Sequence, residues 1–487
     1  MTRRRRQLMQ LCLLFGGIFL ITTGLFIFVY LESIYEHILN EALKFTPTSD
    51  TYKAWRTNDP PLDLDLYLFN WTNPEDITNP NIKPHFEEVG PYRVKEVKEK
   101  TNITWHDNGT ISYGFKKLYF YDPKNSIRIM EDDVVTTINT VPLTVAYQAR
   151  NFSTFIKALI SISMGSISRL YVRKTSKEIL FDGYEDSILN LLSNIPLLKV
   201  QRKFGIFYGR NDTIDPNSIQ SMHIKNDQNF GKQLTWNYKN RTNFYQGHCS
   251  DVRGSAGEFY PLNIKKSKIV LYSSELCKYA ELEFVREEII KGVLGYRFTG
   301  DNIFDNGTTR PENRCFCVDG CIPSGVLDVS ACRQNSPTFL SFPHFHAADP
   351  YYTDMISGMK PNRSRHEFYI VIEPKSGIIM EISANMQMNM LLQPVSGLRL
   401  YRNMPKIFIP VFYLAQTIEL KDDLAFNLRI IQGFPDYLRY SSFFFIMSGV
   451  SLIVWVVCLL FNFCQPTKVI KKNFHEELPL NEKIPIT

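Results

Sequence analysis

The sequence predicts a membrane protein with two spans, whose central part is mainly β with some α. Three observations point to this class. Long apolar runs lie close to both ends of the 487-residue chain. Between them, short segments of alternating apolar and polar residues, separated by polar turns, indicate an antiparallel β body. One internal stretch, about residues 140–200, changes to helical spacing and predicts a helical insert.

Two apolar runs, residues 8–31 and 440–463, are each long enough to cross a bilayer as a helix. At 1.5 Å per residue such a helix reaches about 36 Å, whereas the hydrocarbon core measures ~30 Å. The apolar part of the first run exceeds the ~7–15 residues of a secretory signal peptide, and no small-x-small cleavage pattern follows it. We therefore expect an uncleaved anchor at each end.

Basic residues predict that both ends lie on the same side of the membrane. Arg3–Arg6 precede the first run, and three lysines follow the second one between residues 468 and 472. An excess of Lys and Arg marks the cytosolic side. Residues 1–7 and 464–487 are therefore expected to be cytosolic tails, and residues 32–439 one large extracellular or luminal domain.

Eight N-x-S/T sequons lie between the two apolar runs and none lies in a tail. This placement supports the orientation, because N-linked glycans are added on the extracellular or luminal side. A sequon need not be used, so all eight are candidates. They are Asn70, Asn102, Asn108, Asn151, Asn211, Asn240, Asn306 and Asn362.

Six of the nine cysteines lie in the segment 249–332 and are expected to form disulfides, because the domain faces an oxidising space. Six cysteines allow 15 connectivities, and their spacing does not select one. A C-x-C-x3-C spacing could also hold zinc, but no paired C-x2-C elements accompany it. The six are Cys249, Cys277, Cys315, Cys317, Cys321 and Cys332. Cys464, at the cytosolic end of the second run, is a candidate for S-acylation.

The strand-like segments follow in order along the expected domain. Residues 62–69 read LDLDLYLF, so that the four leucines share one face of a half-buried strand. Further strand-like pieces are expected at 92–97, 115–121 and 127–129, and a long hairpin at 367–392. In its second arm Met386, Met388 and Met390 alternate with Gln387 and Asn389. Methionine fills irregular space, so this face is either ordinary core or the wall of a cavity for acyl chains.

The helical insert carries a stripe of apolar residues and a set of cations. Thr175-x-x-Glu178 is a capping-box pattern and predicts a second helix after the first one. By default the stripe is the seam, the buried contact face, of a small helical bundle. The alternative is an exposed apolar edge that binds lipid or protein. The stripe comprises Phe152, Phe155, Ile156, Leu159, Ile160 and Ile167. The cations Lys157, Arg169, Arg173, Lys174 and Lys177 form an ordinary solvated face or, if clustered, attract anionic partners.

Catalytic and cofactor motifs are absent from the sequence, so no enzyme, cofactor or metal is expected. There is no G-x-S-x-G, H-E-x-x-H, Walker or dinucleotide-binding motif. His344 and His346 have no third ligand nearby and are interpreted as structural, and Glu287-Glu288 as an exposed pair on a helix. The net charge of +6 is modest, and no nucleic-acid-binding motif is present.

An ordered set of short motifs, together with the two-span organisation, resembles the class B scavenger receptors over nearly the whole chain. The motifs are FNWTNPE (69–75), EVGPY (88–92), EILFDGY (178–184), CFC (315–317), GVLD (325–328) and FPHF (342–345). The resemblance implies a large antiparallel β barrel with a membrane-distal helical cap and a tunnel for sterols or fatty acids. Met386, Met388 and Met390 would line this tunnel. It also implies the disulfides Cys249–Cys315, Cys277–Cys332 and Cys317–Cys321.

The resemblance implies a plasma-membrane receptor that binds lipoproteins, apoptotic cells or microbial surfaces through its cap and mediates their uptake. Fatty acids or sterols, membrane lipids and a cytosolic adaptor or kinase would be further partners, and an endosomal or lysosomal pool is possible. The implied ligand-binding residues are Phe152, Phe155, Ile156, Lys157, Leu159 and Ile160. Some family members carry lysines late in the first helix of the cap. Here residues 161–166 read SISMGS, which weakens the case for a lipoprotein ligand.

Two alternatives to uptake of particles stay open. The same architecture could serve selective lipid delivery, of a sterol, a carotenoid or a pheromone. A two-span ion channel would need a polar stripe along its pore, and the second apolar run offers only four serines, without acidic residues.

Overall fold

The computed structural model describes residues 3–57, 61–194, 200–214, 218–225, 227–318 and 320–461. It divides into two compact units, a helical unit and a sheet unit, which are considered separately here. The helical unit comprises Met1–Ile38 with Gly433–Thr487, and the sheet unit comprises Leu39–Gln432.

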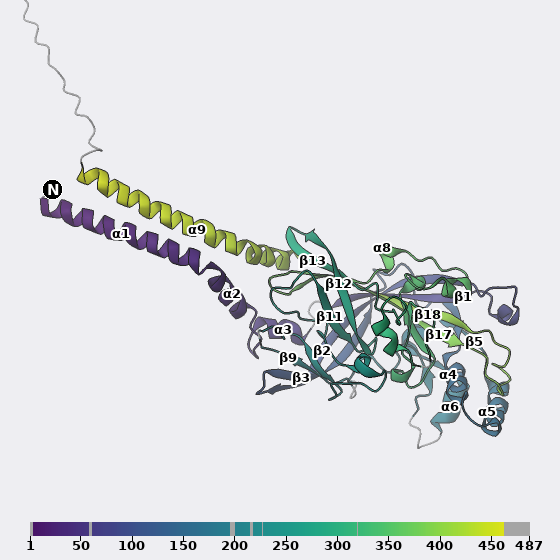
Figure 1. The fold of residues 1–487 in the computed structure, drawn as a ribbon. Coiled ribbons are helices and arrows are strands. Elements are labelled where there is room, and N and C mark those ends of the chain that lie inside the picture. Colours follow the sequence, from purple (N-terminus) through teal and green to yellow (C-terminus); the bar gives the residue numbers. More distant parts are fainter. Residues whose placement is uncertain are drawn as a thin grey trace, which may run out of the picture. The chain divides into compact units, whose positions relative to one another are not determined.

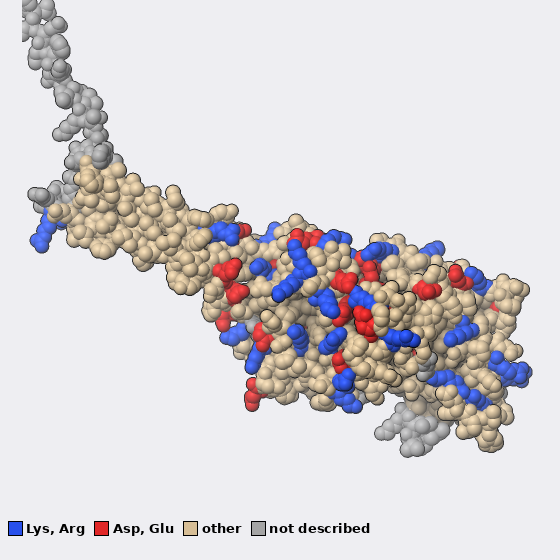
Figure 2. All heavy atoms as spheres, in the orientation of Figure 1, with Lys and Arg blue, Asp and Glu red and all other residues tan. Residues whose placement is uncertain are grey.

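Two helices in the described part of the chain are long and apolar enough to cross a membrane. They are α1 (Arg3–Val29), which contains the apolar stretch Gln7–Val29, and α9 (Asp422–Leu460). A turn at Tyr30 separates α1 from α2 (Leu31–Ala42). In the face shown by Figure 2, the surface of the helical unit is almost without charged side chains, whereas charges of both signs cover the sheet unit.

Glycines form the contact between α1 and α9, which lie side by side within the helical unit (Figure 1). A Cβ atom on Gly17 would lie 2.8 Å from the side chain of Ile453 and 2.9 Å from the carbonyl oxygen of Gly449. A Cβ atom on Gly24 would lie 2.7 Å from the carbonyl oxygen of Ser442. Small residues allow this close approach, which is how helices pack in lipid, where the hydrophobic effect does not drive them together.

One large antiparallel sheet makes up most of the sheet unit, which confirms the predicted fold class. Its central strands come from both ends of the unit, because β1 pairs with β18. The strand order is β10 (Gln233–Trp236), β9 (Gln220–His223), β3 (Thr110–Tyr121), β2 (Phe86–His106), β1 (Leu62–Trp71), β18 (Ile407–Ile418), β17 (Ile379–Leu392), β16 (Tyr369–Ile372), β13 (Val293–Thr299), β12 (Lys278–Ile290) and β11 (Lys268–Ser273). β8 (Thr213–Ile214) adds to β3, β15 (Thr338–Ser341) adds to β17, and β14 (Val326–Asp328) adds to β15.

A short segment at Gly254 and Ser255 joins the two edges of this sheet into a barrel. Gly254 accepts a hydrogen bond from the backbone N–H of Gln233, the first residue of β10, at 2.7 Å. Ser255 donates to Val270 and accepts from Tyr272 on the β11 side, both at 2.8 Å. The segment thereby covers part of both edges, where another chain could otherwise add a strand.

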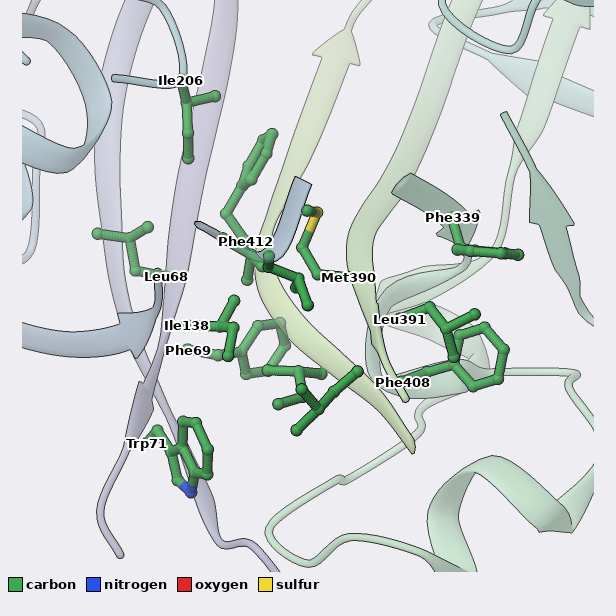
Figure 3. Packing of buried hydrophobic residues seen from close by; sticks show 14 of the residues in the cluster. Leu68, Phe69, Trp71, Ile138, Ile206, Phe339, Met390, Leu391, Phe408 and Phe412 are labelled. Atoms are coloured by element: carbon green, nitrogen blue, oxygen red, sulfur yellow. The ribbon is translucent and has the colours of Figure 1, made fainter. Parts of the chain in front are cut away.

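β1 is buried on both faces in its second half, although its sequence predicts a half-buried strand. Leu66 and Leu68 are fully buried on one face, and Phe69 is fully buried on the other. The ring of Phe69 packs against His344 and Tyr413. Figure 3 shows Leu68, Phe69 and Trp71 among side chains from other parts of the sheet unit, such as Phe412 and Met390. The motif FNWTNPE therefore begins within the core.

The helical insert contains helices and short two-stranded ribbons, gathered at one end of the sheet unit (Figure 1). Thr175 and Glu178 form the predicted capping box: the Glu178 carboxylate accepts from the Thr175 N–H at 3.1 Å, and the Thr175 hydroxyl from the Glu178 N–H at 3.2 Å. The helix that follows is one π-helical turn that ends before Gly183. We call this region the cap: β4 (Val134–Ile138), α4 (Thr140–Ala149), α5 (Thr154–Ile167), β5 (Tyr171–Thr175), the π-helix (Glu178–Asp182), β6 (Tyr184–Glu185), α6 (Ser187–Ser193) and β7 (Lys203–Phe204).

Two local predictions are wrong. Residues 127–129 are not a strand. Asp122 and Ser126 form a turn, the N–H of Ile127 makes one hydrogen bond to the Pro91 carbonyl oxygen of β2, and Ile129 then accepts from Asp132 and Asp133 in a second turn. Glu287 and Glu288 lie on β12, not on a helix, because this segment pairs with β13. The remaining α-helices in the described ranges are short: α3 (Asp50–Arg56), α7 (Pro350–Asp354) and α8 (Arg363–His366).

Three disulfides link loops of the sheet unit: Cys249–Cys315, Cys277–Cys332 and Cys317–Cys321. This is the pairing that the family resemblance implies. Two of them close loops of 66 and 55 residues, for which a disulfide typically contributes about 4 kcal/mol by restricting the unfolded chain.

We expect Gly17→Leu to destabilise the packing of α1 on α9 by about 1–3 kcal/mol, because its side chain has no space next to Gly449 and Ile453. Gly16→Leu is the matched control, since a Cβ atom on Gly16 meets nothing within 4 Å. The thermal-unfolding midpoint of the full chain in lipid nanodiscs should fall for Gly17→Leu and stay unchanged for Gly16→Leu. Equal midpoints for the two variants would contradict the glycine contact.

Candidate functional site

A cavity of about 1270 Å³ lies inside the sheet unit. Its walls are barrel strands, and α4 and α6 of the cap also line it, through Val141, Val145 and Leu189 among others. The volume exceeds the ~300–1,000 Å³ typical of a site for a small ligand. The cavity can therefore accommodate a molecule of the size of a lipid.

The first wall of the cavity is apolar. Met386, Met388 and Met390 of β17 line it, and Phe412 and Leu414 of β18 continue the same surface. Figure 3 shows Met390 close to Phe412. Thioether side chains are flexible and polarisable, so this wall can adapt to acyl chains of different shape.

The polar residues that alternate with these methionines are buried behind the wall and do not face solvent. Gln387 and Asn389 are fully buried, and their side-chain amides bond to each other at 2.7 Å. Asn389 also donates to the Ser341 hydroxyl at 3.0 Å, and Gln387 accepts from the backbone N–H of His344 at 2.7 Å. This network fixes the register of β17. The alternation of methionines with polar residues in the sequence did not reveal that Gln387 and Asn389 are buried.

The second wall of the cavity carries charges, none of which the sequence analysis had singled out. Glu96 on β2 and Lys117 on β3 line it, together with Glu275 and Arg333, which lie next to the Cys277–Cys332 disulfide in sequence. The Glu275 carboxylate lies 2.9 Å from the Lys117 ammonium and 2.9 Å from the Arg333 guanidinium. The charge of Lys117 holds the pKa of Glu275 well below its usual value, against the opposing effect of burial.

The apolar stripe of α5 is mostly exposed, so the default expectation of a bundle seam is wrong for most of its members. Phe155 is 72% exposed and Ile162, which the sequence analysis missed, is 74% exposed. Phe152, Ile156 and Leu159 are also exposed. Against the body, α5 instead packs Met164, which is buried, and Ile160.

Some of the cap cations that were expected to be solvated form ion pairs or are half-buried. Lys157 is half-buried beside Gly397, where a Cβ atom would lie 3.2 Å from the Cβ of Lys157. Lys174 pairs with Glu178 at 3.2 Å, and Lys177 with Glu131 at 3.3 Å. On α5 itself the exposed side chains are mostly apolar, and its single cation is the half-buried Lys157.

A partly buried polar cluster surrounds Glu88 on β2. One oxygen of Glu88 accepts from His344 at 2.6 Å and from Tyr413 at 2.7 Å, and the other accepts from Arg365 at 2.7 Å. His344 also accepts from the N–H of Lys360 through its second ring nitrogen, at 3.2 Å. Both ring nitrogens are used, so His344 has no free atom with which to bind a metal.

His366 stacks on His344, with ring centroids 4.9 Å apart. Its Nδ1 accepts from the backbone N–H of Asn362 at 3.2 Å, and its buried Nε2 has no hydrogen-bond partner within the described part of the chain. Burial lowers the pKa of His366 to about 3, and the charges of His344 and Arg365 add to this effect. His366 is therefore neutral at physiological pH.

Among the described residues, one group of side chains has the spacing of a metal site: His248, Cys249 and Cys315. The two sulfurs are joined in a disulfide, so neither is a thiolate that could bind a metal.

Comparison with known proteins gives the family. The sequence profile of the CD36 family matches residues 14–460. The chain belongs to the CD36 family. Protein peste of Drosophila melanogaster is 33% identical over 447 residues, which cover 88% of this chain and 79% of that protein. Scavenger receptor class B member 1 of Sus scrofa is 27% identical over 93% of this chain and 89% of that protein. Lysosome membrane protein 2 of Rattus norvegicus is 30% identical over 84% of this chain and 86% of that protein.

Membership in the CD36 family confirms the resemblance to class B scavenger receptors that the motifs indicated. With the two long apolar helices, it identifies a two-span membrane protein. Cys464 and the C-terminal tail lie outside the described residues.

The environments of the sequons differ. Six of the eight asparagines are exposed, whereas Asn70 is half-buried and accepts a hydrogen bond from the Thr136 N–H at 2.9 Å. Asn306 is only 6% exposed and its Nδ2 donates to the carbonyl oxygen of Ile322. A glycan has no space there, so the predicted glycan at Asn306 does not fit this structure. The exposed six are Asn102, Asn108, Asn151, Asn211, Asn240 and Asn362.

We expect the sheet unit to lose stability as the pH falls from 7 to 5.5, with His366 contributing about 1 kcal/mol. Its ordinary pKa of 6.5 is lowered to about 3 on folding, so the unfolded chain takes up a proton that the folded protein does not. The stabilisation is complete above pH 6.5 and decreases below it. His366→Asn should flatten this dependence of the thermal-unfolding midpoint.

His106→Gln is the control for this measurement, because His106 is exposed and bonds only to Ser112 among the described residues. Its midpoints at pH 7 and 5.5 should differ as much as those of the unchanged protein. If the midpoint of His366→Asn falls between pH 7 and 5.5 as much as that of the unchanged protein, the assignment to His366 is refuted.

Proposed function

We propose that this protein is a class B scavenger receptor of the cell surface, which captures lipid or particle ligands at its cap and passes lipids through its cavity. The observation that carries this proposal is the cavity of about 1270 Å³, which has an apolar methionine wall and reaches α4 and α6 of the cap. The receptor acts by binding, without catalysis, and needs no cofactor. Its ligands are lipoproteins, apoptotic cells or microbial surfaces, with fatty acids or sterols in the cavity.

Topology and regulation belong to the same proposal. Residues 32–439 lie outside the cell, glycosylated at the exposed sequons, and both tails lie in the cytosol, where an adaptor or kinase binds them. Acylation of Cys464 anchors the second tail. One curated relative is named a lysosome membrane protein, so an endosomal or lysosomal pool accompanies the one at the plasma membrane.

Selective lipid delivery is the second candidate function. The cavity favours it, because a receptor that only engulfs particles needs no enclosed space for a lipid. The two functions separate in one experiment, in which cells that express the protein are assayed in parallel for uptake of a fluorescent lipid and for engulfment of apoptotic cells. Lipid uptake alone supports delivery, and engulfment supports the scavenger receptor.

We expect Met386→Trp with Met388→Trp to lower uptake of a fluorescent lipid about fivefold or more, because two indole rings fill the lumen beside the apolar wall. Val285→Trp is the control, since Val285 is exposed on β12 and does not line the cavity. Uptake should be measured at equal surface expression. Undiminished uptake in the double variant would contradict passage through the cavity.

We expect Phe155→Asp with Ile162→Asp to reduce binding of apoptotic cells several-fold and to leave the protein folded, because both side chains are exposed and make the cap apolar. Ile127→Asp is the matched control, an equally exposed apolar residue outside the cap, at 79% exposure. Binding at equal surface expression is the measurement. Similar binding by the two variants would exclude the α5 surface as the capture site.

A further inference from the structure

The inward face of β2 changes from apolar to charged along the strand. Tyr92 and Val94 are fully buried. The next inward positions are Glu96, Lys98 and Lys100, and the first two line the cavity. Lys100 is buried and pairs with Glu258 at 2.6 Å. Lys98 therefore lies between Glu96 and Lys100 on this face of β2, which is part of the apolar core at Tyr92 and Val94.

Lys98 lies directly opposite Lys117 in the register of β2 and β3. Like charges in such a cross-strand pair repel each other, so each needs a counter-charge. Lys117 has two, Glu275 at 2.9 Å and Glu96 at 3.6 Å. In the described ranges, no carboxylate lies within 4.0 Å of the Lys98 ammonium. Lys98 therefore lines the cavity with a positive charge that no counter-charge in the described part of the protein neutralises.

The cavity as a whole has an excess of positive charge. Arg241 pairs with Asp251 at 2.8 Å, but no described carboxylate pairs with Arg210 or Lys239. Arg210, Lys239 and Arg241 are exposed, so water compensates their charges in part, whereas Lys98 is half-buried and its charge is costly unless a partner neutralises it. Counted over the residues that the structure describes, six cations and two carboxylates line the cavity: Lys98, Lys117, Arg210, Lys239, Arg241 and Arg333, with Glu96 and Glu275.

We propose that Lys98, beside Lys117, is the headgroup subsite of the cavity, and that it makes the cavity prefer carboxylate-bearing lipids to neutral lipids of the same chain. The ammonium of Lys98 donates charge-assisted hydrogen bonds to the carboxylate, while the chain lies along Met386 and Met388. The anion supplies the counter-charge that the protein lacks at this position. This inference rests on the proposed function, since it needs a lipid in the cavity.

The test compares binding of radiolabelled oleate and of methyl oleate, which has the same chain without the charge, to the full-length protein in nanodiscs. Lys98→Met removes the charge and keeps most of the side-chain length. Lys95→Met is the matched control, because Lys95 is on the same strand but pairs with Asp122 at 3.4 Å and does not line the cavity. Acetate is added as a competitor, to distinguish a lipid headgroup from a free carboxylate.

We expect Lys98→Met to weaken binding of oleate about tenfold or more and to change binding of methyl oleate less than about twofold. Lys95→Met should change neither, and millimolar acetate should not displace oleate. Equal binding of oleate and methyl oleate to the unchanged protein, or an equal loss of both in Lys98→Met, would overturn the proposal. Displacement of oleate by acetate would overturn the lipid assignment. Binding of neither lipid would instead refute the proposed function itself.

Discussion

The pairing of β1 with β18 is the constraint on which the rest of the structure depends. These strands begin and end the sheet in sequence, and they lie next to each other in its middle, from Asp63 opposite Thr417 to Leu68 opposite Phe412. The outer strands of the sheet are therefore left to meet on the far side, where Ser255 joins them. A closed sheet has a lumen, and the cap covers one end of that lumen because α4 and α6 line the cavity.

The two walls of the lumen have different chemistry because different strands form them. β17 and β18 contribute mainly methionines and other apolar side chains, with Asn385 and Gln416 as polar exceptions, and Gln387 and Asn389 are buried behind the wall in their own network. β2 and β3 contribute lysines, one of which is neutralised by Glu275 from a distant part of the chain. An amphiphile matches this arrangement better than a hydrocarbon or a small ion does, since it presents both kinds of surface.

The sequence alone was sufficient for the two long apolar helices, for the position of β1 and for the family, because each rests on a local pattern or an ordered set of motifs. It could not identify the packed face of α5, since that helix has apolar residues on most of its sides and periodicity then selects no face. It also could not locate the charged wall. β2 carries charges on both faces near Lys98, and the partners Glu275 and Arg333 lie far away in sequence.

The methionine wall makes the cavity sensitive to oxidants. A thioether is converted by peroxide into a sulfoxide, which is polar and accepts hydrogen bonds, and reductases can reverse this change. Met386, Met388 and Met390 share one surface, so oxidation would turn a lining suited to hydrocarbon into one that attracts water. A receptor of this kind in an oxidative compartment would lose its affinity for lipid chains. Its fold would persist, because the disulfides that stabilise it lie elsewhere in the sheet unit.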